Sequence, residues 1–332
     1  MSFKRVIRWF MVPTGLLVLA SGVFSDVKKN ELELTTPGPV PFPKDNPYSK
    51  AKADLGRKLF FEAKLSKNGE TPCTWCHDPD RGWSDGRTIS IGDPRTALNR
   101  HTPSLYNVGY SERLFWDGRT KTLEEQALFP IKHPNEMAMD LAQVPKVLEK
   151  AGYASDFEAA FGSTEITTEK VAKALSTFER TITHNDTPYD RWLKGDKTAM
   201  TPDAIAGLTV FKTKGQCITC HAGPHFTLAM LKDGDAYKNT GLYQSPVLDP
   251  DSGRMEVDKA NKEMKDAFKI PSLRGVGRSA PYMHNGTLAT LQEVVEFYDR
   301  GGDHDKLPKL GLTVTEKKQL VEFLRRGITN RD

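Results

Sequence analysis

The four cysteines of this 332-residue chain restrict its fold more than any other feature, because they fall in two copies of one short motif. The copies are PCTWCHDP, with Cys73, Cys76 and His77, and QCITCHAG, with Cys217, Cys220 and His221. The spacing C-x-x-C-H is typical of c-type haem attachment, in which two thiols add to the vinyl groups of one porphyrin. The adjacent histidine supplies an axial nitrogen to the iron. The sequence therefore predicts two covalently bound haem c groups, with His77 and His221 as iron ligands.

Paired cysteines have three other common uses: a disulfide, a zinc site and a thioredoxin-like redox pair. Zinc sites also use C-x-x-C pairs, but they do not require a histidine directly after each second cysteine. A thioredoxin-like pair expects a βαβ pattern, which the sequence does not show. Haem attachment is therefore favoured over the three alternatives.

The N-terminus predicts export. Basic residues among the first eight precede an apolar run over residues 9–24, which is short for a membrane span and is interrupted by Pro13. Residues 1–25 therefore predict a secretory signal peptide, and an uncleaved anchor is the alternative. Covalent haem is attached outside the cytoplasm. Leader and haem motifs together indicate a periplasmic protein with no integral membrane domain after signal removal.

The rest of the chain is long enough for two modest domains. Residues 26–48 include TTPGPVPFPKDNP and predict an extended, proline-rich arm. Each haem motif follows an amphipathic helix and a Lys/Gly turn, which predicts two haem domains over 49–195 and 196–332. The last helix is free to pack back on the first domain. The 47 basic and 43 acidic residues are interspersed, so nucleic-acid binding has no support.

Helix signals dominate the sequence. Apolar residues follow helical spacing from Val171 to Ile182. Start signals for three further helices are Thr201 followed by Pro202, the capping box Thr290 with Glu293, and the capping box Thr313 with Glu316. Strand signals are few. We therefore expect a mostly α protein built from two cytochrome c-like haem domains.

Two further stretches carry a resemblance to a known family. FWDGR and LEEQA follow the first haem motif, and PSLRGVGRSAPYMHNGTLATLQEVVEFY follows the second. With the haem motifs, they resemble the bacterial di-haem cytochrome c peroxidases and their MauG-like relatives over nearly all of the mature chain. The resemblance implies an enzyme that uses hydrogen peroxide and an electron-donor protein or an oxidisable partner protein.

The resemblance implies roles for four residues near the first haem. Trp116 would lie between the haems and carry electrons or holes. Gln126, Pro130 and Glu136 would line the distal pocket, with Glu136 as the acid–base residue. Burial of a carboxylate in a largely apolar pocket can raise its pKa toward the working pH, as proton transfer to and from peroxide requires. On the residues alone, Glu136 could equally be an exposed loop carboxylate.

Two positions depart from the peroxidases that need prior reduction. Asp93 stands where those proteins have a histidine that blocks the first haem, so this haem should be open without reduction. Those peroxidases have a methionine ligand to the second haem. Tyr298 stands at this position, and a tyrosine there is typical of the MauG-like branch. A phenolate ligand favours oxidised iron. Met283 is the competing ligand. In that case Tyr298 would simply continue the apolar stripe of the helix that carries it.

The resemblance also implies a calcium ion between the haems, bound by the carbonyl groups of Ser279 and Pro281 and by one amide side chain. His101 stands in place of the usual asparagine and is a poor ligand for a hard cation, although Asn99 is close by. Four other histidines have no motif role: His133, His225, His284 and His304.

Three functions follow from these patterns. The first is an exported MauG-like peroxidase that activates hydrogen peroxide at the first haem and oxidises an external donor or partner through the second. The second is an ordinary cytochrome c peroxidase supplied by a small cytochrome or a cupredoxin. The third is a non-catalytic di-haem electron carrier. Gly215 stands where one family member has a surface tryptophan that relays holes; the alternative exits are Trp75, Trp83 and Trp192.

Overall fold

The computed structural model describes residues 32–330, except for residue 94 and residues 243–250. The α-helices are α1 (Lys50–Phe60), α2 (Leu123–Lys132), α3 (Val144–Lys150), α4 (Ala154–Phe161), α5 (Thr168–Glu179), α6 (Pro188–Leu193), α7 (Pro202–Lys212), α8 (Leu291–Asp299) and α9 (Val314–Glu322). Two short antiparallel strands, β1 (Tyr237–Lys238) and β2 (Phe268–Lys269), pair Tyr237 with Lys269. The mostly α prediction is confirmed. The predicted signal peptide lies outside the described residues.

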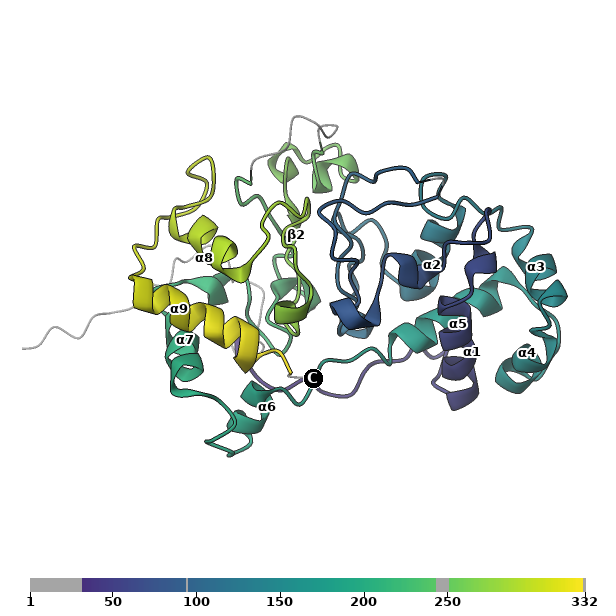
Figure 1. Ribbon diagram of the computed structural model, residues 1–332, viewed down its shortest axis with the longest axis horizontal. Coiled ribbons are helices and arrows are strands. Elements are labelled where there is room, and N and C mark those ends of the chain that lie inside the picture. The colour runs from purple at the N-terminus through teal and green to yellow at the C-terminus, as the bar shows by residue number, and fades with distance from the viewer. Residues whose placement is uncertain (1–31, 94, 243–250, 331–332) are drawn as a thin grey trace, which may run out of the picture.

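The helices form two groups that lie side by side, with β2 between them (Figure 1). In the first group α1 packs on α5, and α2 and α4 complete a core that contains Phe60, Phe157 and Leu175. In the second group α7 packs on α9, with α8 alongside, around Phe211 and Phe323. The last helix thus packs within the second group, not against the first as the sequence had allowed.

The two groups repeat one close helix contact. A side chain at Gly56 of α1 would collide with the carbonyl oxygen of Ala174 in α5. A side chain at Gly207 of α7 would likewise collide with the carbonyl oxygen of Gln319 in α9. Glycine allows the backbones to approach in both halves. The helix before each haem motif therefore packs in the same way, which agrees with the similar lead-ins in the sequence.

The predicted helix starts are confirmed. The Thr290 side chain accepts a hydrogen bond from the Glu293 backbone while the Glu293 carboxylate accepts one from Thr290, and Thr313 forms the same box with Glu316. Thr201 caps α7 by accepting from the Ala204 backbone. Within residues 32–330 that the structure describes, no helix is both long and apolar enough to span a bilayer.

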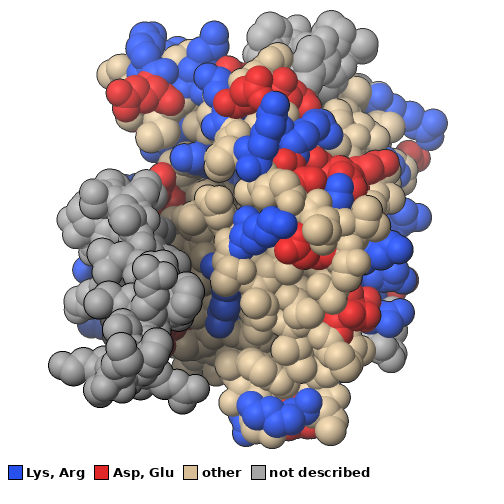
Figure 2. All heavy atoms as spheres, turned by 90° about the vertical axis from the view of Figure 1, so that its left-hand side faces the viewer, with Lys and Arg blue, Asp and Glu red and all other residues tan. Residues whose placement is uncertain are grey.

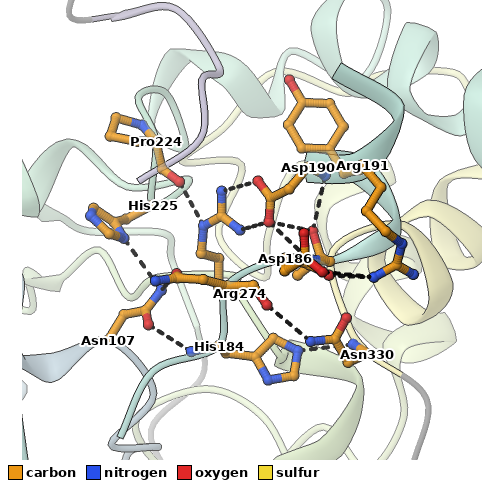
Figure 3. Close-up of polar contacts among 12 residues, drawn as sticks. Asn107, His184, Asp186, Asp190, Arg191, Pro224, His225, Arg274 and Asn330 are labelled. Atoms are coloured by element: carbon orange, nitrogen blue, oxygen red, sulfur yellow. Dashed lines mark hydrogen bonds and ion pairs between the residues drawn. The ribbon is translucent and has the colours of Figure 1, made fainter. Parts of the chain in front are cut away.

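A buried polar cluster joins the two halves (Figure 3). The guanidinium of Arg274 makes two hydrogen bonds of 2.7 and 2.9 Å to the carboxylate of Asp190, and its Nε donates to the Pro224 carbonyl at 2.6 Å. Asn107, from the first half, lies with its amide nitrogen 3.4 Å from His225 Nδ1 of the second half. Both members of the ion pair are almost completely buried. Loss of one partner would leave a buried charge, which is costly.

The N-terminal arm contacts both halves. Leu34 lies in the second core, and its carbonyl accepts a hydrogen bond from the Tyr189 hydroxyl at 2.6 Å. Further along, the Gly38 carbonyl accepts from the Tyr110 hydroxyl at 2.7 Å, and the Asn46 amide donates to the Lys173 carbonyl at 3.0 Å. Residues 33–48 contain no helix or strand. That residues 26–48 form an extended arm stays a prediction.

Candidate functional site: two haem-attachment motifs

Both C-x-x-C-H motifs fold into the same short turn. In the first, the His77 backbone N–H donates to the Cys73 carbonyl at 2.9 Å, and in the second His221 donates to Cys217 at 2.9 Å. All four cysteines are free, so neither pair forms a disulfide. Burial raises the pKa of every one of these thiols. The turn places the thiols and the following histidine together.

Each motif histidine is held by one carbonyl oxygen. His77 Nδ1 lies 2.9 Å from the Trp83 carbonyl, and His221 Nδ1 lies 2.8 Å from the Phe226 carbonyl. A carbonyl can only accept, so Nδ1 carries the hydrogen and Nε2 keeps its lone pair. Burial lowers the pKa of both imidazoles, that of His221 to about 4. Neutral, oriented imidazoles fit ligation of haem iron.

One large cavity opens beside the first motif. Its volume is about 760 Å³, and Cys73, Cys76 and His77 lie on its wall. The same wall contains the four residues assigned to the first haem by resemblance: Trp116, Gln126, Pro130 and Glu136. We call this space the first-motif cavity. It brings all seven of these predicted residues to one place.

Glu136 lies on the loop after α2, and the fold fixes this loop on two sides. The Met137 N–H donates to the Pro130 carbonyl at 3.1 Å, and the Glu136 carbonyl accepts from the Asp93 N–H at 2.6 Å. The carboxylate is 24% exposed and lies 3.5 Å from His133 Nδ1. Burial raises its pKa, while the nearby charges of His133 and Arg119 oppose the rise. Glu136 is therefore a partly buried group at the cavity, not a free surface carboxylate.

Pro130 stands inside α2 and changes the helix at the cavity wall. Proline has no backbone N–H, so the carbonyl of Gln126, four residues earlier, loses its helical donor. Gln126 and Pro130 both line the cavity. Gln126 therefore adds a polar residue and Pro130 an apolar ring to the cavity that Glu136 also lines.

Trp116 connects the two halves. Its indole N–H donates to the His101 carbonyl at 2.8 Å, and its own carbonyl accepts from the Lys269 N–H of β2 at 2.7 Å. The residue is 9% exposed. It therefore lines the first-motif cavity while its backbone is bonded to the second half.

Tyr298 and Met283 have different surroundings. Tyr298 lies on α8, where burial and the nearby thiols of Cys217 and Cys220 raise its pKa. Met283 lies instead on the wall of the first-motif cavity and has a positive φ of 74°. Tyr298 thus shares the environment of the second motif, and Met283 shares that of the first.

Comparisons with known proteins cover almost the whole chain. Residues 50–198 match the family described as di-haem cytochrome c peroxidase. The methylamine utilization protein MauG of Methylophilus methylotrophus is 35% identical over 326 residues, 96% of this chain and 94% of its own length. The cytochrome c551 peroxidase of Nitrosomonas europaea is 36% identical over 256 residues, 76% of this chain and 74% of its own length. This chain belongs to the di-haem cytochrome c peroxidase and MauG family.

A solved member of this family has the same fold. The crystal structure of a MauG-like protein associated with microbial copper homeostasis superposes with a TM-score of 0.81 at 30% identity, covering 92% of this chain and 95% of that one. Family membership makes the chain a haem peroxidase, with haem c as its cofactor and hydrogen peroxide as its substrate. It also disfavours the non-catalytic carrier.

The resemblance predicts that Asp93 replaces a blocking histidine. Its side chain is buried, and Oδ2 accepts a hydrogen bond from the Asn68 N–H at 3.2 Å. Asp93 is not among the residues on the cavity wall. The short loop that carries it is held against the Glu136 loop through the Asp93 N–H.

The histidine at the expected calcium position is not free to bind an ion, and calcium stays a prediction. His101 Nδ1 lies 2.7 Å from the Arg87 carbonyl and Nε2 lies 3.2 Å from the Ser84 hydroxyl, so both ring nitrogens have protein partners. Asn99, Ser279 and Pro281 line the cavity. Across the described ranges, no group of three or more acidic, histidine or cysteine side chains could hold a metal ion. The mechanism below therefore uses no calcium.

Among the charged residues of the cavity wall that sequence reasoning missed are Arg119 and Lys269. Arg119 was visible as the last letter of FWDGR, and its guanidinium lies over the Phe115 ring, 3.4 Å from the centroid. Lys269 gave little signal, because a lysine in a short strand usually faces solvent. Of the histidines without a motif role, His133 lies beside Glu136, and the rings of His284 and Phe268 stack at 3.5 Å.

Proposed function

We propose that this haem peroxidase is exported, activates hydrogen peroxide at the first haem, and oxidises an external electron donor or a partner protein through the second. The observation that carries the proposal is the difference between the two motifs. The first opens onto a cavity with a partly buried carboxylate, Glu136, whereas the second has the phenol of Tyr298 close to its thiols. One site has room for a small substrate and a group to move its proton.

At the first site, bound haem would supply the redox chemistry that reduces peroxide to water. The proposed role of Glu136 is to accept one proton from hydrogen peroxide at a carboxylate oxygen and to return it to the departing oxygen. Its raised pKa suits both transfers. Gln126 would orient the substrate, and the Pro130 ring would exclude water from one side of it. His133, 3.5 Å from the Glu136 carboxylate, would hold that group in place.

At the second site, His221 and Tyr298 would be the protein ligands of the haem iron. The proximity of Tyr298 to the thiols of Cys217 and Cys220 supports this assignment, as does the location of Met283 beside the first motif. Trp116, bonded to both halves, is the proposed path between the sites. Since Asp93 bonds to Asn68 away from the cavity, the first haem should be open in the oxidised protein.

We propose two haem domains over 49–195 and 196–332, with Tyr189 of α6, just before this limit, already packed in the second core. The first core contains residues from Leu55 to Ile182, and the second contains residues from Tyr189 to Ile328 together with Leu34 of the arm. The predicted leader, residues 1–25, supports a periplasmic location. Neither inference rests on the peroxidase chemistry.

The partner is proposed to be a protein. On the face of the second half, Lys and Arg are interspersed with Asp and Glu, and uncharged surface lies between them (Figure 2). This pattern fits a protein partner and does not resemble a nucleic-acid site. Of the candidate exits, Trp75 is 42% exposed, whereas Trp83 and Trp192 are partly buried against the cores. An ordinary peroxidase supplied by a small cytochrome or cupredoxin is the alternative.

The ferric protein as isolated gives the test. We expect electron paramagnetic resonance to show one high-spin haem, open at the first site, and one low-spin haem. Peroxide should react with this fully oxidised protein at once. Two low-spin haems, or a reaction that requires prior reduction by one electron, would contradict the proposal.

A further inference from the structure

The wall of the first-motif cavity carries several cationic side chains, and most of them already have protein partners. The arginines are satisfied: Arg100 and Arg119 pair with Asp117, Arg274 pairs with Asp190, and Arg113 donates to the Ala229 and Leu231 carbonyls. Lys269 also lines the cavity. Within the described part of the chain, its ammonium makes no hydrogen bond or ion pair, and no nearby charge offsets its burial.

The main chain fixes Lys269 at this place. It is the last residue of β2, and its N–H donates to the Trp116 carbonyl at 2.7 Å. On either side, Phe268 and Ile270 are buried, and the Ile270 N–H donates to the Ala236 carbonyl at 2.8 Å. The strand therefore cannot turn Lys269 toward solvent without exposing two apolar neighbours. Its side chain belongs to the cavity.

A lone cation in such a place is unfavourable. Burial lowers the pKa of Lys269 to about 8, because the charged ammonium is less well solvated there than in water. Buried charges in proteins are normally paired with an opposite charge. An anion that enters the cavity would supply such a partner, and haem carries two propionate carboxylates on one edge.

We propose that Lys269 binds a propionate of the haem attached to the first motif. The ammonium neutralises part of the carboxylate charge and holds the porphyrin edge beside Trp116. A positive charge near the haem also favours the reduced iron, so Lys269 raises the reduction potential of this haem. This role goes beyond the proposed peroxide chemistry and needs only that the first haem lies in the cavity.

The test is to remove the charge from the holoprotein with Lys269→Met. Thioether bonds hold the haem, so its content should stay at two per chain, checked by mass spectrometry. Spectroelectrochemical titration should then show the first haem about tenfold harder to reduce, a shift of about 59 mV for a one-electron couple. Lys269→Arg should restore the potential, since it keeps the charge. Lys265→Met, an exposed lysine nearby, is the control and should change nothing.

A second measurement covers the case in which Lys269→Met does not fold. Redox-difference infrared spectra of the wild type and Lys269→Gln, prepared with haem labelled at the propionate carboxyls, report the carboxylate directly. We expect the labelled band to shift in Lys269→Gln. An unchanged band, or an unchanged potential in Lys269→Met, would overturn the role of Lys269. Peroxide reactivity is measured separately, so this result leaves the proposed function intact.

Discussion

The two haem-attachment motifs share a local fold and differ in what stands opposite their histidines. His77 and His221 are oriented by the same kind of carbonyl bond, to Trp83 and Phe226. Beyond the histidine, the first motif opens onto a cavity of about 760 Å³, whereas the second has a tyrosine from α8 among its thiols. The repeat supplies attachment, and the residues outside the repeat supply the difference in chemistry.

The difference shows why a duplicated unit can carry two tasks. The loop that carries Glu136 follows α2, between the lead-in helix α1 and its partner α5, and helix α8 with Tyr298 lies between α7 and α9 in the second half. Each half thus has an equivalent pair of packed helices and its own inserted segment between them in the sequence. Selection can change one insert without disturbing the other site. The experiments below act on one site at a time, or on what the sites share.

Glu136→Gln should separate the two sites most strongly. The amide cannot accept the peroxide proton, and loss of a general acid–base group typically costs about 10²–10⁴-fold in rate. Stopped-flow mixing of the ferric protein with hydrogen peroxide measures the loss, while the second-haem spectrum should stay as in the wild type. Glu125→Gln, an exposed carboxylate on α2, the helix before this loop, is the control. A wild-type rate in Glu136→Gln would remove Glu136 from the mechanism.

Arg274→Met should destabilise the buried polar cluster that joins the two halves. The variant leaves the buried Asp190 carboxylate without its guanidinium, and removal of one member of a buried pair costs about 3–5 kcal/mol of unfolding free energy. Denaturant titration measures this loss. The double variant Arg274→Met/Asp190→Asn should recover part of it. If the single variant is as stable as the wild type, the cluster in Figure 3 does not hold the halves together.

Tyr298→Phe should change only the second site. Both haems remain attached through the cysteines, but the low-spin signal of the second haem should be lost, because phenylalanine offers no ligand atom. Peroxide should still react at the first site, and oxidation of the donor should fall. Met283→Leu is the matched variant and should leave the second-haem spectrum unchanged. The reverse pattern would make Met283 the ligand.

The pH dependence should belong to the first site alone. Proton acceptance needs the Glu136 carboxylate, and burial raises its pKa, so the peroxide rate should fall as the pH drops through a value above that of an ordinary glutamate. Below this value the rate should fall about tenfold for each pH unit. The measurement is a pH–rate profile with the second-haem spectrum recorded in parallel. A flat profile across the acid range would contradict the assignment.

Thr122→Ala and Thr290→Ala should have the smallest effects. Each removes a cap, at the start of α2 and of α8 respectively, at a cost of about 1 kcal/mol. Thermal unfolding measures the cost. If the helices position their sites independently, Thr122→Ala should slow only the peroxide reaction and Thr290→Ala should alter only the second-haem spectrum. Equal effects at both sites would show that the helices are coupled.

The sequence predicted the parts of the site that depend on local pattern. Cap residues, haem motifs and the helical stripe from Val171 to Ile182 depend on neighbours within a few positions, and the structure has the corresponding turns and helices. The cavity residues Glu136 and Trp116 were named from the family resemblance, because their spacing alone does not bring them together. Their functional roles stay predictions.

Other features depend on long-range packing and could not be read from the chain. Lys269 reaches the cavity only because β2 pairs with the backbone of Trp116. The Arg274–Asp190 pair joins residues 84 positions apart. The packing of α9 on α7 was likewise left open, since an amphipathic helix does not reveal which apolar surface it covers. These are tertiary contacts with no local signal.

The arm has a consequence for how the polypeptide matures. The Leu34 carbonyl accepts a hydrogen bond from Tyr189, 155 positions later in the chain. The Thr35 carbonyl accepts one from Arg274, 239 positions later. A ribosome releases the arm first, but most of the chain must emerge before its last contact exists. Contacts of such long range form slowly. The opening segment should therefore be among the last to settle, and it stays accessible to maturation enzymes until the final third of the protein has folded.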